Sequence, residues 1–171
     1  MTDLERFRRQ KDAWLKSSPD SPLPYGDREH FAGLRYYPEN PALRLRLPLE
    51  ELAEKQPIKM ITSTGAVQDY LRWGTLRFDV DGQPAELTVY YASWGELFVP
   101  FADATSGTET YGAGRYLELE QLEDGAVLAD FNLAYNPYCA YSEDYSCPIP
   151  PAENRIDVPI RAGELAYGEP H

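Results

Sequence analysis

Hydrophobic positions near the start of the chain recur at the spacing of a helix. Leu4, Phe7 and Trp14 fall roughly on one helical face. Thr2 and Glu5 have the separation of a capping box, in which two side chains satisfy free amides at a helix N-terminus. We therefore predict a helix over residues 2–17 whose apolar face, carrying Phe7 and Trp14, docks on the rest of the molecule and covers an open end of a sheet.

From residue 34 to residue 131 the hydrophobic period changes to two, which is typical of half-buried strands. In ALRLRLPLE (residues 42–50) leucines alternate with arginines and a proline, which predicts a strand near a sheet edge. Asp81–Gly82 lies between two alternating runs and predicts a hairpin, and Asp124–Gly125 predicts a second one between 116–120 and 126–131. No helix-length pattern separates the strands, so parallel crossover units are not expected. We predict a mainly β fold, an antiparallel sandwich or a small barrel.

The alternation stops after Phe131. The stretch DFNLAYNPYCAYSEDYSCPIPPAENR (residues 130–155) holds four tyrosines, four prolines and both cysteines of the chain. Loops longer than ~15 residues are uncommon in compact domains, and each buried aromatic ring contributes about 150–250 Å² of packed surface. We expect residues 132–171 to form an ordered irregular strap on the β core. The expected organisation is a single domain over residues 1–171, with the helix at 2–17 and the core at 34–131.

Charge narrows the set of partners. Sixteen basic residues against twenty-eight acidic ones give a net charge of −12. Such a field repels phosphate backbones and anionic headgroups, so neither nucleic acid nor a membrane surface is an expected partner. No signal-peptide pattern and no run of ~20 apolar residues is visible. We therefore expect a cytoplasmic protein, in which Cys139 and Cys147 are mostly thiols.

Three stretches carry a resemblance to a known family: LFVPFADATSGTETYGAGRYL (97–117), the tyrosine-rich stretch at 130–155, and VPIRAGE (158–164). They closely resemble the signature of the bacterial and archaeal domain-of-unknown-function family numbered 1684. The upstream FAGLRYYPENPALRLR (31–46) is similar to that family's N-terminal portion. The resemblance implies a shared fold and shared polar motifs, and it brings no assigned activity.

The segment FADATSGTETYGAGRY (101–116) is the first candidate for chemistry. Its glycines permit positive φ, so successive amides could form an anion-binding nest, with Arg115 clamping a carboxylate or phosphate. The segment matches neither a phosphate loop nor a dinucleotide fingerprint. The alternative, which we favour, is a tight turn whose side chains bond their own backbone while Arg115 pairs internally with Asp103 or Asp130.

The cysteines form the second candidate. Cys139 and Cys147 lie eight residues apart, which matches no Cys-x-x-Cys redox or zinc spacing. Only His30 and His171 could assist a metal or a thiolate, so we predict no metal site and no cofactor. Structural thiols are favoured over reactive ones. A disulfide between the two cysteines is the alternative if the compartment is oxidising.

The third candidate is a set of amides and carboxylates around the tyrosines. Burying such a group without a partner costs about 1–3 kcal/mol, so these side chains either satisfy the backbone of the strap or face a wet pocket. The combined ligand-binding candidates are Asp103, Thr105, Thr110, Tyr111, Arg115, Asp130, Asn132, Asn136, Tyr141 and Asn154.

We predict a small-molecule binding module whose strap and 103–115 loop leave a polar, tyrosine-lined pocket at one end of the core, with an anion as one candidate ligand. An enzyme is the first alternative, with Asp103, Asp130 or Glu109 as general acid or base and Tyr111 or Arg115 stabilising an anion. The second alternative is a structural or interaction protein that forms a homodimer through edge strands and tyrosine-rich surface.

Overall fold

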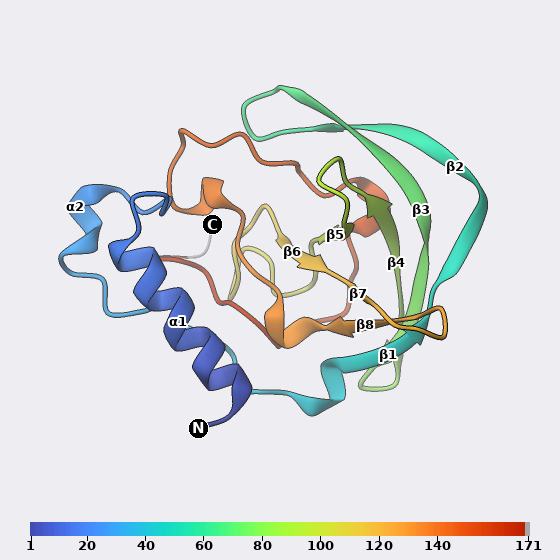
Figure 1. Cartoon of the computed structure of the whole chain (residues 1–171), viewed down its shortest axis with the longest axis horizontal. Helices are drawn as coiled ribbons and strands as arrows, with labels where there is room; N and C mark the ends of the chain where they lie inside the picture. The colour runs from blue at the N-terminus through green and yellow to red at the C-terminus, as the bar shows by residue number, and fades with distance from the viewer. Residues whose placement is uncertain (170–171) are drawn as a thin grey trace.

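The computed structural model describes residues 1–169, so His171 and the end of the predicted strap lie outside the described part of the chain. The chain begins with α1 (Asp3–Ser17), which lies at one side of the molecule, opposite the curved strands (Figure 1). The Thr2 hydroxyl accepts from the Glu5 amide at 3.1 Å, and the Glu5 carboxylate accepts from the Thr2 amide at 3.0 Å. The predicted helix and its capping box are therefore confirmed. A second helix, α2 (Tyr25–Arg28), is a single turn.

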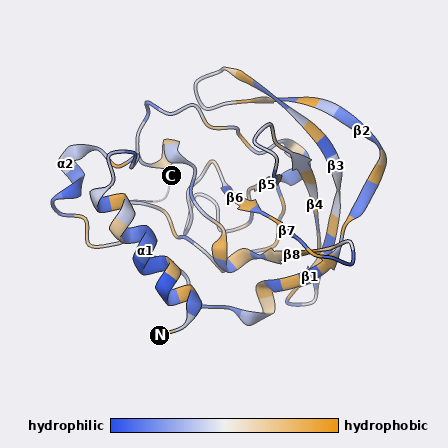
Figure 2. Ribbon diagram, in the orientation of Figure 1, coloured by the Kyte–Doolittle hydropathy of each residue, from blue (hydrophilic) through white to orange (hydrophobic). Residues whose placement is uncertain are grey.

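The face of α1 that docks is not the predicted apolar one. Phe7 and Trp14 are 45% and 39% exposed, and the one fully buried residue of α1 is Leu15. Figure 2 shows that most of the helix surface is hydrophilic. The docked side consists of positions spaced i, i+3, i+4 and i+7, which share one helical face: Arg8, Lys11, Asp12 and Leu15. Apolar periodicity selected the wrong side because this helix is held largely by polar contacts.

Five strands form a large antiparallel sheet in sequence order: β2 (Glu50–Ile61), β3 (Val67–Val80), β4 (Gln83–Tyr91), β5 (Leu97–Phe101) and β6 (Arg115–Glu118). The predicted hairpin joins β3 to β4. Asp81 and Gly82 have φ values of 49° and 80°. Two successive positive φ angles give the turn a twist that matches the flanking strands.

A smaller antiparallel sheet has the order β1 (Arg44–Pro48), β8 (Ala126–Asp130) and β7 (Glu120–Gln121). β1 is an edge strand, as its proline predicted. The hairpin at Asp124–Gly125 forms, but within it β8 pairs with only the two residues of β7, while its other edge pairs with β1. The expected pairing with residues 116–118 is wrong, because that segment pairs with β5 in the other sheet. Leu119, whose amide donates to the Leu97 carbonyl at 3.1 Å, lies where the chain passes between the sheets.

The two sheets share one hydrophobic core. It combines Leu76, Leu87 and Val99 of the large sheet with Ala129 of the small sheet and Ile160 from the C-terminal segment, all fully buried. The mainly β, antiparallel prediction is confirmed. The barrel alternative is not, since neither sheet closes on itself in residues 1–169.

After β8 the chain continues as an irregular segment, which we call the strap (residues 132–169). Isolated bridges connect it to earlier parts of the chain at Tyr135, Pro148, Arg155 and Glu164. Their partners are, in the same order, Tyr116, Thr62, Ala102 and Tyr36. Pairing with segments so distant in sequence makes the strap a wall of the folded body. Over residues 1–169, no helix is long and apolar enough to cross a membrane.

Candidate functional site

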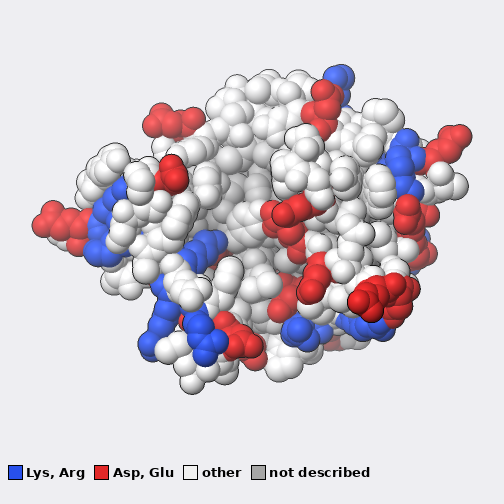
Figure 3. All heavy atoms as spheres, viewed as in Figure 1, with Lys and Arg blue, Asp and Glu red and all other residues white. Residues whose placement is uncertain are grey.

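A cleft of about 500 Å³ separates α1 from the first part of the strap. We call it the strap cleft. Its lining residues are Phe7, Gln10, Lys11, Trp14 and Leu15 from α1, and Tyr135, Asn136, Tyr138 and Tyr141 from the strap. Aromatic side chains dominate this lining, and three of them are substantially exposed: Phe7, Trp14 and Tyr138. In Figure 3 the molecular surface beside α1 is hollowed, with basic side chains on the helix side and acidic ones across from it.

The buried carboxylate of Glu164 organises the inner end of the cleft. Glu164 is 2% exposed. Its Oε1 accepts from the Asn136 amide at 2.9 Å and from the Tyr141 hydroxyl at 3.3 Å, and its Oε2 pairs with the Lys11 ammonium. The Lys11 charge is therefore neutralised by a neighbour that is more deeply buried than itself. Burial, with the charge of Glu164 nearby, raises the pKa of Tyr141 well above its ordinary value, so this phenol stays protonated.

Asn136 carries a polar atom that the protein leaves unused. The residue is 1% exposed, its backbone amide bonds to Glu164, and its Nδ2 donates to the Leu165 carbonyl at 3.0 Å. Its Oδ1 is buried and has no hydrogen-bond partner among residues 1–169. A buried acceptor without a partner costs about 1–3 kcal/mol. Asn136 thus keeps a buried carbonyl oxygen that receives no hydrogen bond from residues 1–169.

Tyr135 forms the wall beneath Lys11. The Lys11 ammonium lies 5.1 Å from the centre of the Tyr135 ring and forms a cation–π contact with it. The Tyr135 hydroxyl donates a hydrogen bond to Glu118. Burial raises the pKa of Glu118, although the hydrogen bond from Tyr135 acts in the opposite direction. Burial also raises the pKa of Tyr135, and the Glu118 charge adds to this effect. The Tyr135 side chain is consequently held by two contacts: its hydroxyl bonds to Glu118 of β6, and its ring face contacts Lys11 of α1.

The 103–115 loop, considered above as an anion-binding nest, forms an internal clamp on the strap. Arg115 is fully buried, and its guanidinium donates to the carbonyls of Ala162 at 2.5 Å and Ile160 at 2.8 Å. Asp103 lies 3.6 Å from it and accepts from the Ile160 amide at 2.6 Å. Burial lowers the pKa of Arg115, against the opposing charge of Asp103. This is the internal pairing with Asp103 that the sequence analysis favoured.

Several other predicted ligand-binding residues are also engaged by the protein. Thr105 donates to both carboxylate oxygens of Asp103 at 3.0 Å and contacts Thr110 at 3.0 Å. Asn154 accepts from the Thr88 amide at 2.7 Å and donates to the Thr88 and Pro100 carbonyls. Asn154 satisfies backbone groups, as the structural interpretation of the amide set predicted, whereas Thr105 and Thr110 bond to other side chains. The lining of the strap cleft includes none of the three.

Asn132 and Asp130 form hydrogen bonds to the backbone where the strap begins. Asn132 accepts from the Asn40 amide at 2.8 Å and donates to its carbonyl at 3.0 Å. Asp130 accepts from the Asn132 amide at 3.1 Å and caps a short 3-10 turn. Both residues border a separate open depression near the start of α1. Of the ten predicted ligand-binding residues, only Asn136 and Tyr141 line the strap cleft.

Each of the carboxylates proposed for catalysis is paired with an arginine. Asp103 is buried against Arg115, and Asp130 lies 3.6 Å from Arg44. Glu109 pairs with Arg161 at 3.2 Å and accepts from the Tyr37 hydroxyl at 2.8 Å. Hydrogen bonds from Arg161 and then Tyr37 lower the pKa of Glu109. None of the three lines the strap cleft.

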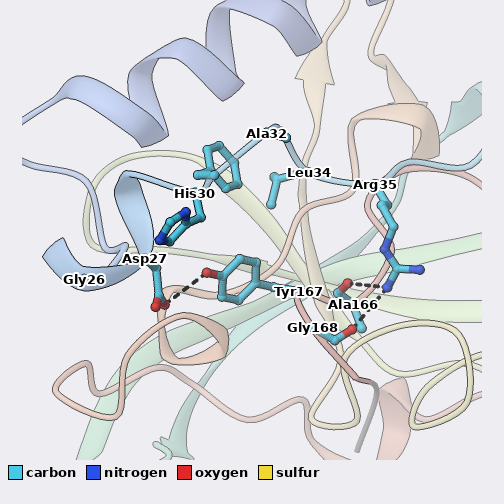
Figure 4. A pocket seen from close by; sticks show the side chains of 11 residues that line it. Gly26, Asp27, His30, Ala32, Leu34, Arg35, Ala166, Tyr167 and Gly168 are labelled. Atoms are coloured by element: carbon cyan, nitrogen blue, oxygen red, sulfur yellow. Dashed lines mark hydrogen bonds between the residues drawn. The ribbon is translucent and has the colours of Figure 1, made fainter.

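A second cavity of about 470 Å³ lies between α2 and the end of the described chain (Figure 4). His30 stands at its edge. Tyr167 donates to Asp27 at 3.1 Å, and Arg35 donates to the carbonyls of Ala166 and Gly168, each at 3.1 Å. These polar groups of the cavity lining are bonded to one another. Within residues 1–169, no group of three or more His, Cys, Asp or Glu side chains is placed to hold a metal ion.

The sequence analysis missed most of the strap cleft. Phe7 and Trp14 were expected to be docked, and Lys11 and Glu164 were not singled out. A usable signal was present in the charged residues at positions 8, 11 and 12, which recur on one helical face. The tyrosines at 135, 138 and 141 share a spacing of three, although nothing in that spacing identifies the helix as their partner.

Comparison with known proteins agrees with the fold and brings no activity. The sequence model of the family described as "Protein of unknown function (DUF1684)" matches residues 29–165. Among solved structures, an uncharacterised protein of Haloarcula marismortui, determined by NMR in solution, is 37% identical to this chain, with a TM-score of 0.73. The match covers 95% of this chain and 91% of that one. No curated protein matches the chain.

Proposed function

Because the chain belongs to the DUF1684 family of proteins of unknown function, and that membership supplies no ligand, we propose from the geometry alone that the protein binds a small organic molecule in the strap cleft. The observation that carries the proposal is the unpaired Oδ1 of Asn136, an acceptor buried at the lining of a cleft rich in aromatic side chains. A ligand that donates one N–H or O–H to this oxygen removes its desolvation cost.

The aromatic lining indicates the body of the ligand. Phe7, Trp14 and Tyr138 are 45%, 39% and 40% exposed. Large apolar side chains gathered around a concave site favour a flat or apolar group that buries their faces. The proposed ligand therefore combines such a body with a single donor at one end.

The charges favour a neutral or cationic ligand over an anion. Lys11 is already paired with Glu164, and Glu118 lies behind Tyr135. The anion expected from the sequence relied on Arg115, whose Nη atoms donate to carbonyls of the strap. The catalytic alternative, the homodimer and the cytoplasmic location remain predictions.

Three probes of similar size test the proposal: indole, which has a neutral donor; tryptamine, which has a cationic one; and benzoate, an anion. Binding is followed by NMR of the labelled chain, together with native mass spectrometry of the freshly purified protein for a co-purified compound. We expect indole or tryptamine to shift the resonances of Asn136 and Tyr138, and benzoate to bind more weakly.

Trp14→Ala and Trp94→Ala form a matched pair, because Trp94 is 51% exposed and lies outside the strap cleft. Trp14→Ala should weaken binding about tenfold, corresponding to about 1.4 kcal/mol, and Trp94→Ala should leave it unchanged. The proposal is wrong if no compound co-purifies and no probe shifts the cleft resonances at about 1 mM. It is also wrong if the two variants behave alike.

A further inference from the structure

Cys139 and Cys147 lie side by side where the strap doubles back on itself. The Cys139 amide donates to the Cys147 sulfur at 3.2 Å, and both side chains pack in the same hydrophobic cluster. Cys147 is 8% exposed, whereas Cys139 is half-buried. Both are free thiols. One thiol is thus accessible to a small reagent while its neighbour is shielded.

Contacts from distant parts of the chain hold the pair in place. The Ser63 hydroxyl, in the turn between β2 and β3, accepts from the Cys147 amide at 3.1 Å. The Ser63 amide donates to the Cys147 carbonyl at 2.9 Å. From the 103–115 loop, the Tyr111 hydroxyl lies 3.6 Å from the Cys139 sulfur. Three segments separated in sequence therefore meet at the two cysteines.

These neighbours make the two thiols unequal. Hydrogen bonding from the Cys147 thiol, with smaller contributions from Tyr111 and Ser63, lowers the pKa of Cys139 to about 6 in spite of its burial. The hydrogen bond with Cys139, together with burial, raises the pKa of Cys147. These opposite shifts favour the thiolate at Cys139, the less buried of the two residues. The thiolate is the nucleophilic form of cysteine.

We propose that Cys139 and Cys147 form a peroxide-reactive thiol pair that closes reversibly to an intramolecular disulfide. The Cys139 thiolate attacks one oxygen of hydrogen peroxide or an organic hydroperoxide. The O–O bond breaks, Cys139 becomes a sulfenic acid, and the departing oxygen takes a proton to leave as water or an alcohol. The Cys147 sulfur then attacks the Cys139 sulfur, the S–O bond breaks, and the released hydroxide takes the Cys147 proton to form water. Two thiols are oxidised and one peroxide is reduced.

The closing step requires the two sulfur atoms to approach each other. A disulfide holds its sulfurs about 2.05 Å apart, closer than two thiols in contact, so one arm of the strap must shift. The segment between the cysteines contains the exposed residues Glu143 and Asp144, which have room to move. A dithiol reductant reverses the reaction by thiol–disulfide exchange. In the cytoplasm expected from the sequence, a disulfide of this kind is transient.

The test uses the reduced full-length chain and hydrogen peroxide. Intact mass should fall by two hydrogens, peptide mapping without reductant should recover a Cys139–Cys147 cross-link, and dithiothreitol should restore the original mass. In Cys147→Ser, dimedone should trap a sulfenic acid at Cys139. In Cys139→Ser, peroxide should consume Cys147 at least about tenfold more slowly.

A matched variant tests the role of the neighbours. Tyr111→Phe removes only the hydroxyl near Cys139, so the pH at which Cys139 alkylation reaches half its maximal rate should rise. Cross-links between chains in place of within one chain would overturn the proposal. So would equal peroxide reactivity of Cys147 in Cys139→Ser, or a wild-type chain that keeps both thiols under peroxide. The mass measurement and the peptide mapping use the wild-type chain, so these two results do not depend on the folding of a variant or on the ligand of the strap cleft.

Discussion

Lys11 and Glu164 form an ion pair that joins α1 to the strap across 153 positions of sequence. The Lys11 side chain is 22% exposed and that of Glu164 is 3% exposed. Since Glu164 also accepts hydrogen bonds from Asn136 and Tyr141, this carboxylate fixes the helix and the strap at the same point. The strap cleft lies directly beside this pair, so its shape depends on a contact between the two ends of the chain.

Removing Glu164 should be strongly destabilising. Glu164→Ala leaves Lys11 and two strap donors without their acceptor, and breaking a buried pair by removing one partner costs about 3–5 kcal/mol. Lys11→Met should cost less, because Glu164 keeps its two other donors. Urea unfolding measures both. As a control, Lys59→Met breaks a surface pair whose side chains are 73% and 80% exposed, and it should change stability by no more than about 1 kcal/mol. Equal effects of Glu164→Ala and Lys59→Met would contradict the role assigned to Glu164.

Arg115→Met should detach the end of the strap. The change removes the donors to the Ile160 and Ala162 carbonyls and leaves Asp103 buried without its cation, a loss of about 3–5 kcal/mol. Amide exchange around residues 158–166 should accelerate more than exchange in β3. Arg46→Met is the control, since its pair with Asp124 is on the surface. If protection is lost uniformly over the chain, Arg115 is not a local clamp.

Two glycines with nearly the same φ allow the cost of backbone strain to be separated from the cost of a steric clash when each is replaced by alanine. Gly163 and Gly125 have φ values of 84° and 85°, so alanine is equally strained at both. A Cβ on Gly163 would lie 2.6 Å from the Ala134 carbonyl oxygen, whereas one on Gly125 meets nothing within 4 Å. Gly163→Ala should therefore destabilise by about 1–3 kcal/mol more than Gly125→Ala, as measured by urea unfolding. Similar losses would mean that the strap tolerates a shift at Gly163.

Glu118 should give the protein a specific pH dependence. Its pKa in the folded state is raised by burial, so the folded chain favours the protonated carboxyl. For a raised pKa, the contribution to stability is complete below the unfolded value and is lost as the pH rises through the folded one. The stability of the wild type relative to Glu118→Gln should thus decline as the pH rises above about 4. Urea unfolding at several pH values tests this, with Glu120→Gln, on the exposed strand β7, as control. A relative stability that rises over the same range would show that the hydrogen bond from Tyr135 outweighs burial.

Local features of the fold could be predicted from the sequence because neighbouring residues decide them. The capping box at Thr2 and the turn at Asp81–Gly82 depend on a few adjacent residues. The alternation in β1 needs only the period of a strand. The irregular strap was also predictable, because its prolines and asparagines exclude regular structure while its tyrosines favour packing.

The sequence by itself therefore determined the antiparallel β core, the helix ahead of it and the irregular segment after it, since each follows from short-range rules. Only the tertiary structure decided which face of α1 docks, because that face is polar and finds its partner at Glu164. It also decided that Arg115 clamps the strap, that Asn136 keeps an unpaired acceptor in a cleft, and that Cys139 meets Cys147 under Tyr111. These relationships join positions far apart in the chain, and no local pattern records which distant groups will satisfy a buried charge or amide.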